Sequence, residues 1–152
     1  MKLFMETTKI DAGKTVAEIQ NILGQYGCTG VMTMYENNEV KAVAFQIMFM
    51  DKNIAFKLPC RWECIYKNFA DRRASGKDKP VHRADDDAQQ AKRVAWRQIL
   101  RWVEAQMALV ETDMVKVHEV FLPYLQMNIK GETLADKFSE SGMKMLGHTK
   151  DI

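Results

Sequence analysis

Residues 85–111 read DDDAQQAKRVAWRQILRWVEAQMALVE, and neither glycine nor proline interrupts them. Three aspartates come first, where the positive end of the helix macrodipole favours negative charge. Strong helix formers such as alanine, leucine, glutamine and arginine fill much of the remainder. The segment therefore predicts one long, continuous helix.

The apolar residues of this helix fall on two adjoining sides, because successive residues turn by about 100°. A helix that packs on one sheet needs only one apolar stripe. We therefore expect two covering elements: a β-sheet, and either the helix predicted over residues 114–125 or the same long helix of a second copy. Symmetric dimers are the common solution, so we predict a homodimer and keep coverage within one chain as the alternative. One side holds Ala91, Val94, Ala95, Trp102, Ala105 and Leu109, and the other holds Trp96, Leu100, Val103, Met107 and Val110.

A narrow polar strip on the same helix carries Arg93, Arg97 and Arg101, together with Glu104. Like charges at this spacing repel one another, so other groups must neutralise them. Carboxylates of the same chain, such as Asp86 and Glu104, can do so. External phosphate groups can do so equally well, because their oxygens match the fork of a guanidinium group.

More positive charge precedes the helix, and Trp62, Tyr66 and Trp96 lie near it in the sequence as stacking candidates. Cations beside aromatic rings are typical of sites that bind single strands or nucleotides. A solvated loop and a salt-bridged helix are the alternative interpretation. The predicted anion or nucleic-acid site comprises Arg72, Arg73, Lys77, Lys79, Arg83, Arg93, Arg97 and Arg101.

The N-terminal half predicts a helix followed by a three-stranded antiparallel meander, and hence an α+β fold. Thr15-Val16-Ala17-Glu18 fits a capping box that starts a helix over residues 15–26. Residues 41–49 and 54–58 alternate with a period of two, and residues 31–35 form a short β-rich run. Turns are predicted at residues 36–39 and 51–53, where asparagine tolerates a positive φ.

The segments that flank the long helix complete the predicted domain. Helical spacing predicts a helix over residues 61–70, and residues 71–83 read as a long loop. Beyond the long helix we expect a helix over residues 114–122, ended by Pro123, and a last short helix that starts at Thr133. The sequence thus predicts a single α+β domain over residues 1–141 and a flexible tail over residues 142–152.

Composition indicates a globular protein without a global charge that compels a nucleic-acid partner. Apolar residues make up 47%, charged residues 28%, and the net charge is +2. Cys28, Cys60 and Cys64 show no disulfide spacing, and no apolar run is long enough for a signal peptide or a membrane span. We therefore expect a cytoplasmic protein with free thiols and no membrane partner.

No complete catalytic or metal-binding motif is present in the sequence. His82, His118 and His148 are scattered, and the spacing of Cys60 and Cys64 does not match a zinc site. We therefore predict neither enzymatic activity nor a metal or other cofactor, unless folding brings together a paired acid and base.

Residues 90–97 (QAKRVAWR), 102–109 (WVEAQMAL) and 120–124 (VFLPY) resemble a block in small uncharacterised proteins of phages, prophages and other mobile elements. The likeness covers about residues 15–133 and implies a setting, that of an accessory protein, without a particular activity. The order helix, three strands, helix also resembles double-stranded RNA-binding domains and the cores of some strand-annealing proteins. The Gly-Lys-Lys type of loop of the RNA-binding domains is absent here.

These features favour a non-enzymatic protein that binds nucleic acid or a nucleoprotein complex of the host cell, in replication, recombination or counter-defence. Counter-defence includes inhibition of a defence nuclease, as anti-CRISPR proteins do. A second hypothesis is an oligomer that captures an anionic nucleotide messenger between its subunits. A third is an enzyme whose site the sequence does not reveal.

Overall fold

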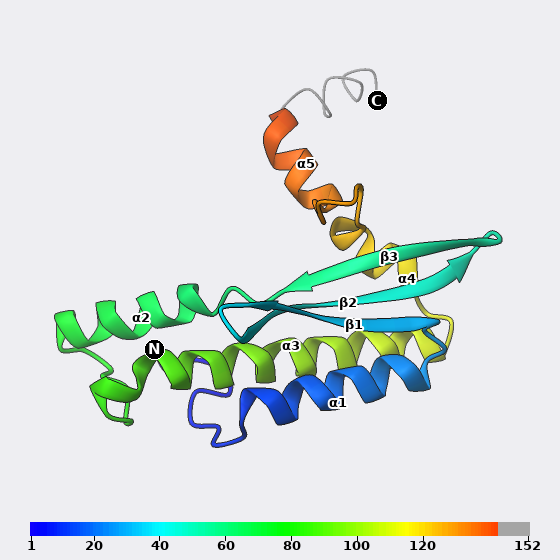
Figure 1. The fold of residues 1–152 in the computed structure, drawn as a ribbon. Coiled ribbons are helices and arrows are strands. Elements are labelled where there is room, and N and C mark those ends of the chain that lie inside the picture. Colours follow the sequence, from blue (N-terminus) through cyan, green and yellow to red (C-terminus); the bar gives the residue numbers. More distant parts are fainter. Residues whose placement is uncertain (143–152) are drawn as a thin grey trace.

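Figure 1 shows the α+β fold in a computed structural model, which describes residues 1–142. The order of elements confirms the predicted fold class: an N-terminal helix, a three-stranded sheet, and then the long helix and its companions. The elements are α1 (Ala12–Gln25), β1 (Gly30–Glu36), β2 (Glu39–Phe49), β3 (Lys52–Pro59), α2 (Trp62–Ser75), η1 (Ala84–Asp86), α3 (Asp87–Glu111), α4 (Val117–Phe121), η2 (Leu122–Tyr124) and α5 (Leu134–Ser141).

The three strands form an antiparallel meander in the order β1-β2-β3. Asn37 and Asn38 turn β1 into β2 with φ angles of 52° and 63°, in the left-handed region that two-residue hairpin turns of type I′ require. Met50 and Asp51 make the second turn in the same way, with φ angles of 49° and 63°. The second turn therefore precedes the predicted one at residues 51–53, and β3 begins at Lys52 rather than Ile54.

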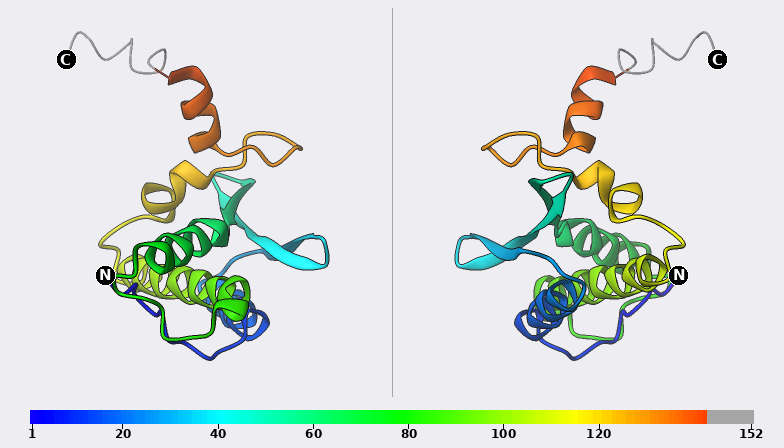
Figure 2. Two further views of the ribbon diagram at one scale, coloured as in Figure 1. Left: turned by 90° about the vertical axis from the view of Figure 1, so that its left-hand side faces the viewer. Right: turned by 90° about the vertical axis from the view of Figure 1, so that its right-hand side faces the viewer.

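One face of the sheet and one side of α3 form the main core. Phe45 on β2 stacks on Phe56 of β3 with ring centroids 5.3 Å apart, and both are buried. Trp96 and Leu100 of α3 belong to the same cluster, which α1 completes. Figure 2 shows α1 and α3 side by side beneath the sheet, with α5 projecting from the opposite end of the molecule.

The second apolar side of α3 is covered largely by the chain itself. Phe69 of α2 packs against Ala91 and Val94 near the start of α3. Further along α3, the ring of Trp102 meets Phe121 of α4 at 5.2 Å and Tyr124 of η2 at 5.5 Å. Most of this apolar side of α3 is thus covered by the same chain. The homodimer remains a prediction, but an uncovered side of α3 no longer supports it.

Several predicted boundaries are corrected by the structure. α1 begins at Ala12, so Thr15 lies inside the helix rather than at its N-cap. Its hydroxyl donates to the carbonyl of Asp11. α2 extends to Ser75, which places Arg72 and Arg73 on a helix rather than in a loop. The helix predicted over residues 114–122 shrinks to α4, because Asp113 has a positive φ of 58° and the backbone stays irregular up to Lys116.

The last helix starts as the sequence predicts. The hydroxyl of Thr133 accepts from the N–H of Asp136, and the carboxylate of Asp136 accepts from the N–H of Thr133. This reciprocal capping satisfies two N–H groups that would otherwise have no partner. The predicted tail covers residues 142–152, of which the structure describes only Gly142. Residues 143–152 lie outside the described part.

The segment before α1 has no regular structure and runs along α3. The side-chain amide of Gln90 donates to the carbonyls of Glu6 at 2.7 Å and Thr8 at 2.9 Å. The amide of Gln98 donates to the carbonyl of Phe4 at 2.8 Å. Glutamines on α3 thus satisfy backbone groups that an irregular segment cannot pair by itself. Within residues 1–142, no helix is long and apolar enough to cross a lipid bilayer.

Candidate functional site

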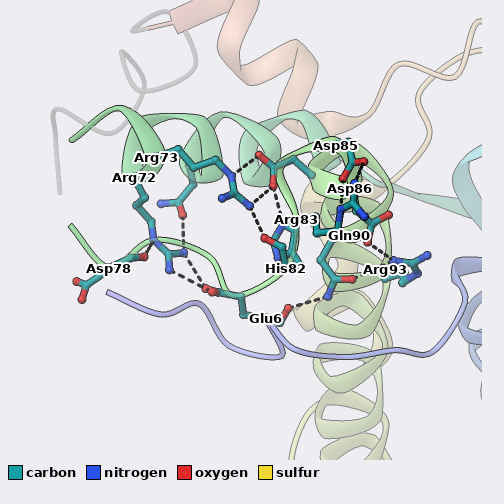
Figure 3. A network of polar contacts seen from close by, with 12 residues as sticks. Glu6, Arg72, Arg73, Asp78, His82, Arg83, Asp85, Asp86, Gln90 and Arg93 are labelled. Atoms are coloured by element: carbon teal, nitrogen blue, oxygen red, sulfur yellow. Dashed lines mark hydrogen bonds and ion pairs between the residues drawn. The ribbon is translucent and has the colours of Figure 1, made fainter. Parts of the chain in front are cut away.

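Arg72 takes part in a buried ion pair inside the chain. Its guanidinium donates to both carboxylate oxygens of Glu6, at 2.7 and 3.1 Å, and its Nε donates to the carbonyl of Asp78 at 2.7 Å (Figure 3). Burial alone would raise the pKa of Glu6, but hydrogen bonds from Arg72 and from the N–H of Leu3 outweigh it and hold the pKa below its ordinary value. Arg72 is therefore occupied, and the prediction that it contacts a ligand is corrected.

Arg73 is held in the same way one residue later. It donates two hydrogen bonds to Asp87, at 2.9 and 2.8 Å, and a third to the carbonyl of His82 at 2.7 Å. These bonds from Arg73 hold the pKa of Asp87 below its ordinary value against the opposing effect of burial, and a bond from His82 assists them. The network fastens the loop over residues 76–83 to the start of α3, so Arg73 too is structural.

The arginine strip of α3 is neutralised by carboxylates of the same chain. Arg93 pairs with Asp86 at 3.2 Å, Arg97 with Glu18 at 3.0 Å, and Arg101 with Glu104 at 2.8 Å. The Arg97 side chain is only 5% exposed, whereas that of Arg101 is 42% exposed. The strip is thus the salt-bridged helix of the alternative interpretation, and it does not form a continuous ridge of unpaired guanidinium groups.

The three predicted stacking residues differ in accessibility. Trp96 is 2% exposed in the main core, which corrects its assignment as a stacking residue. Trp62 is half-buried, with the ammonium of Lys92 over its ring at 4.6 Å. Tyr66 on α2 remains 45% exposed and packs edge-on against Trp62. Among the three, Tyr66 alone presents an accessible ring without further rearrangement.

The remaining predicted cations lie together at one end of the molecule. Lys77 and Lys79 are exposed in the loop after α2 and form no ion pair within residues 1–142. Arg83 pairs with Asp85 at 2.9 Å, yet its side chain is 86% exposed. The amino group of Met1 bonds Asp78 at 2.7 Å, which brings Lys2 to the same loop. Lys2, Lys77, Lys79 and Arg83 are called the cationic end below.

A pocket of about 420 Å³ opens between the N-terminal segment and the start of α3. Arg93 is the one residue of the predicted site that lines it, and sequence patterns do not indicate the others. The sole signal is the polar side chain of Gln90 beside the apolar positions of the helix, and Gln90 is in fact buried. The lining residues are Glu6, Thr7, Thr8, Lys9, Val81, His82, Asp86, Gln90 and Arg93.

His82 and Asp87 form a pair that no sequence motif indicates. The Nε2 atom of His82 lies 2.6 Å from a carboxylate oxygen of Asp87, and its Nδ1 atom is buried without a hydrogen-bond partner in the described part of the chain. A general base must reach the proton that it removes. This Nδ1 atom is shielded and Asp87 is already neutralised by Arg73, so the pair is not poised for acid–base chemistry in this conformation.

Metal binding and known relatives provide no further guide to the site. Among residues 1–142, no three histidine, cysteine, aspartate or glutamate side chains are placed to hold a metal ion together. Cys28, Cys60 and Cys64 are free thiols. The chain matches no family model, no curated protein and no solved structure.

Proposed function

We propose that this chain is a non-enzymatic binding protein that contacts the phosphate backbone of nucleic acid, alone or within a nucleoprotein complex, through its cationic end. The supporting observation is the contrast between its arginines and its loop cations. Arg72 and Arg97 are buried in internal ion pairs and Arg73 is half-buried in another. By contrast, Lys77, Lys79 and Arg83 remain exposed in one short loop. The setting of a phage or mobile-element accessory protein, including counter-defence, rests on the sequence resemblance alone.

Lysines suit this role because an ammonium group is a compact charge that binds phosphate without a fixed geometry. Contacts between lysines and the phosphate backbone of nucleic acid release counterions, so affinity falls steeply as the salt concentration rises. They carry no base information, and the proposal therefore expects little sequence preference. The exposed ring of Tyr66 on α2 is available to stack on a base if a single strand continues along that helix.

The experiment is a fluorescence-anisotropy titration of labelled single-stranded DNA, duplex DNA and RNA at several salt concentrations. We expect binding whose logarithmic salt slope falls by about one for each phosphate contact removed. The test variant is Lys77→Glu/Lys79→Glu/Arg83→Glu. Its matched control is Lys14→Glu/Lys52→Glu/Lys130→Glu, which changes the net charge equally at exposed positions elsewhere. Equal loss of affinity in both variants, or binding that does not depend on salt, would refute the proposal.

A second candidate function is favoured by the pocket beside Arg93. Its volume of about 420 Å³ is within the range of small-molecule sites. Lys9 and Arg93 supply positive charge there, and Gln90 supplies an amide, which together suit a small anionic ligand such as a nucleotide messenger. The carboxylates of Glu6 and Asp86, which also line the pocket, oppose this charge. Thermal-shift measurements with a panel of nucleotides, repeated on Arg93→Gln, distinguish this candidate, because the cationic end is unchanged in that variant.

A further inference from the structure

A second hollow lies where the covering of α3 is incomplete. α2 covers the early part of this side of α3, and η2 covers the later part, so a gap remains between them. The gap holds about 430 Å³ and is called the α2–η2 groove. Its floor is made by Ala95, Ile99 and Trp102 of α3, and its lining is completed by Leu58, Pro59, Arg61, Cys64, Ile65, Gln98 and Tyr124.

The floor of the groove is apolar and only partly shielded from water. Ile99 and Trp102 are of intermediate exposure, although both belong to the packed periphery of the core. On the wall of the groove, Ile65 is equally half-buried. These partly exposed apolar side chains, rimmed by polar groups, could still be covered by a partner. The polar rim here consists of Arg61, Cys64 and Gln98.

Arg61 has a property that sets it apart from the other six arginines. Each of those lies within 4.0 Å of a carboxylate of its own chain; their partners are Glu6, Asp87, Asp85, Asp86, Glu18 and Glu104. Arg61 is exposed and has no such partner anywhere in residues 1–142. The carboxylate of Asp136 is close enough for the charge of Arg61 to help lower its pKa, after the larger effect of the N–H of Thr133, but the two side chains are not within 4.0 Å of each other.

The position of Arg61 joins the groove to its surroundings. Arg61 lines the groove and also two neighbouring hollows, one toward the end of the sheet and one toward α5. Arg61 is the one charged residue among those that line the groove, beside its apolar floor, and it is exposed. A carboxylate placed there would complete the pattern that every other arginine of the chain follows, and two hydrogen bonds would fix its orientation.

We propose that the α2–η2 groove binds an amphipathic helix of a partner protein, whose apolar side chains cover Ile99 and Trp102 and whose carboxylate pairs with Arg61. A helix suits this groove better than an extended peptide. An extended peptide gains its affinity from hydrogen bonds to a free strand edge, and β3 contributes only its last two residues, Leu58 and Pro59, to this groove. Pro59 has no N–H to donate, and the other walls are the helical segments α2 and η2. A helix satisfies its own backbone and needs only apolar contacts at intervals of three and four residues.

The test uses three synthetic helical peptides of about 18 residues, long enough to be helical in part. They share one leucine face and differ at a single flanking position, which is Glu, Gln or Lys. We expect the Glu peptide to bind the wild-type chain about tenfold more tightly than the Lys peptide, as a close charge pair at an interface can achieve. The variant Arg61→Glu should reverse that order, and calorimetry measures both.

One further variant and one chemical modification test whether the peptides bind in the groove rather than by non-specific hydrophobic contact. Ile99→Glu should weaken all three peptides at least about tenfold, because it places a charge on the apolar floor. Alkylating the exposed thiol of Cys64 with a bulky maleimide blocks the same groove without altering a core residue, and should have the same effect. Lys52→Glu, at the far hairpin turn, is the matched charge control and should change nothing.

The proposal is overturned if the three peptides bind equally, if Arg61→Glu does not reverse their order, or if none binds. It is also overturned if sedimentation equilibrium shows a dimer of the wild-type chain that Ile99→Glu converts to a monomer, because the occupant is then a second copy. Nucleic-acid affinity provides a separate readout, since Arg61→Glu lies outside the cationic end and should leave it unchanged.

Discussion

The carboxylate of Glu6 and the guanidinium of Arg72 meet through two hydrogen bonds, of 2.7 and 3.1 Å, although 66 residues separate them in the sequence. Both side chains are buried, and the pair binds the N-terminal segment to the last turns of α2. The same turns carry Arg73, which holds Asp87 at the start of α3. At this end of the molecule, charge pairing thus adds to the apolar packing of Phe69 against Ala91 and Val94.

Removal of one partner of this pair should cost more than removal of both. Arg72→Met leaves the buried carboxylate of Glu6 without its ion-pair partner, and we expect a loss of about 3–5 kcal/mol in the free energy of unfolding. The double variant Glu6→Gln/Arg72→Met removes both charges and should lose clearly less. Urea denaturation of the three proteins measures the difference. A double variant that loses as much as Arg72→Met, or more, would contradict a coupled buried pair.

Acid should weaken the fold through Glu6 and Asp87. The pKa of each carboxyl lies below its ordinary value, 4.5 for Glu6 and 3.8 for Asp87. Stabilisation by such groups is complete above the ordinary pKa and is lost as the pH falls through the lower pKa of the folded state. We expect these groups to destabilise the fold progressively below about pH 4.5 and not above about pH 5.5.

The variant Glu6→Gln should flatten this acid dependence of the free energy of unfolding. Asp113→Asn, which changes an exposed carboxylate after α3, is the matched control and should keep the wild-type slope. Urea denaturation at intervals between about pH 3 and pH 7 gives the slopes. An unchanged slope in Glu6→Gln would show that the carboxyl is not held ionised by Arg72.

The three thiols should differ sharply in reactivity. Burial raises the pKa of Cys60 to about 12 and that of Cys28 to about 11, so neither supplies thiolate near neutral pH. Cys64 is exposed at the rim of the α2–η2 groove. We expect one maleimide adduct per native chain, located at Cys64 by peptide mass spectrometry, and three adducts after unfolding in guanidinium chloride. A native chain that takes up label at Cys60 would show the core to be open.

The ring of Phe121 should be a main attachment point of the C-terminal segments. It is fully buried, and it packs edge-on against Phe45 at 5.2 Å and against Trp102 at the same distance. Phe121→Ala should therefore cost about 3–5 kcal/mol of unfolding free energy. Leu122→Ala removes an exposed neighbour and should cost less than about 0.5 kcal/mol. Similar losses in both variants would contradict this packing.

The secondary structure is largely predictable because it depends on local patterns. The helix over residues 87–111 follows from its period and from the absence of glycine and proline, and the meander follows from alternation in β2 and β3. Errors arise where the backbone departs from the regular pattern between two elements. The end of α3 is predicted correctly, but α4 begins at Val117 rather than Met114, after a positive φ of 58° at Asp113 that composition does not indicate.

The candidate site is less predictable because ion pairing depends on tertiary distance. Nothing local tells that Glu18 on α1 meets Arg97, or that Glu6 meets Arg72, since these partners are far apart in the sequence. A count of cations therefore overstates the accessible positive charge. Asp86 is predictable as a partner for the strip because it lies one to two helical turns from Arg93, and that prediction is confirmed.

The bonds from Gln90 and Gln98 to carbonyls of the N-terminal segment have a practical consequence for anyone who expresses the chain. A chain shortened at its N-terminus to begin at Lys9 would leave those amides, and the guanidinium of Arg72, facing water or one another. Affinity tags fused ahead of Met1 would emerge beside the same lysines whose binding is to be assayed. A chain that keeps residues 1–8 and carries a cleavable tag, removed before any oligonucleotide titration, avoids both artefacts.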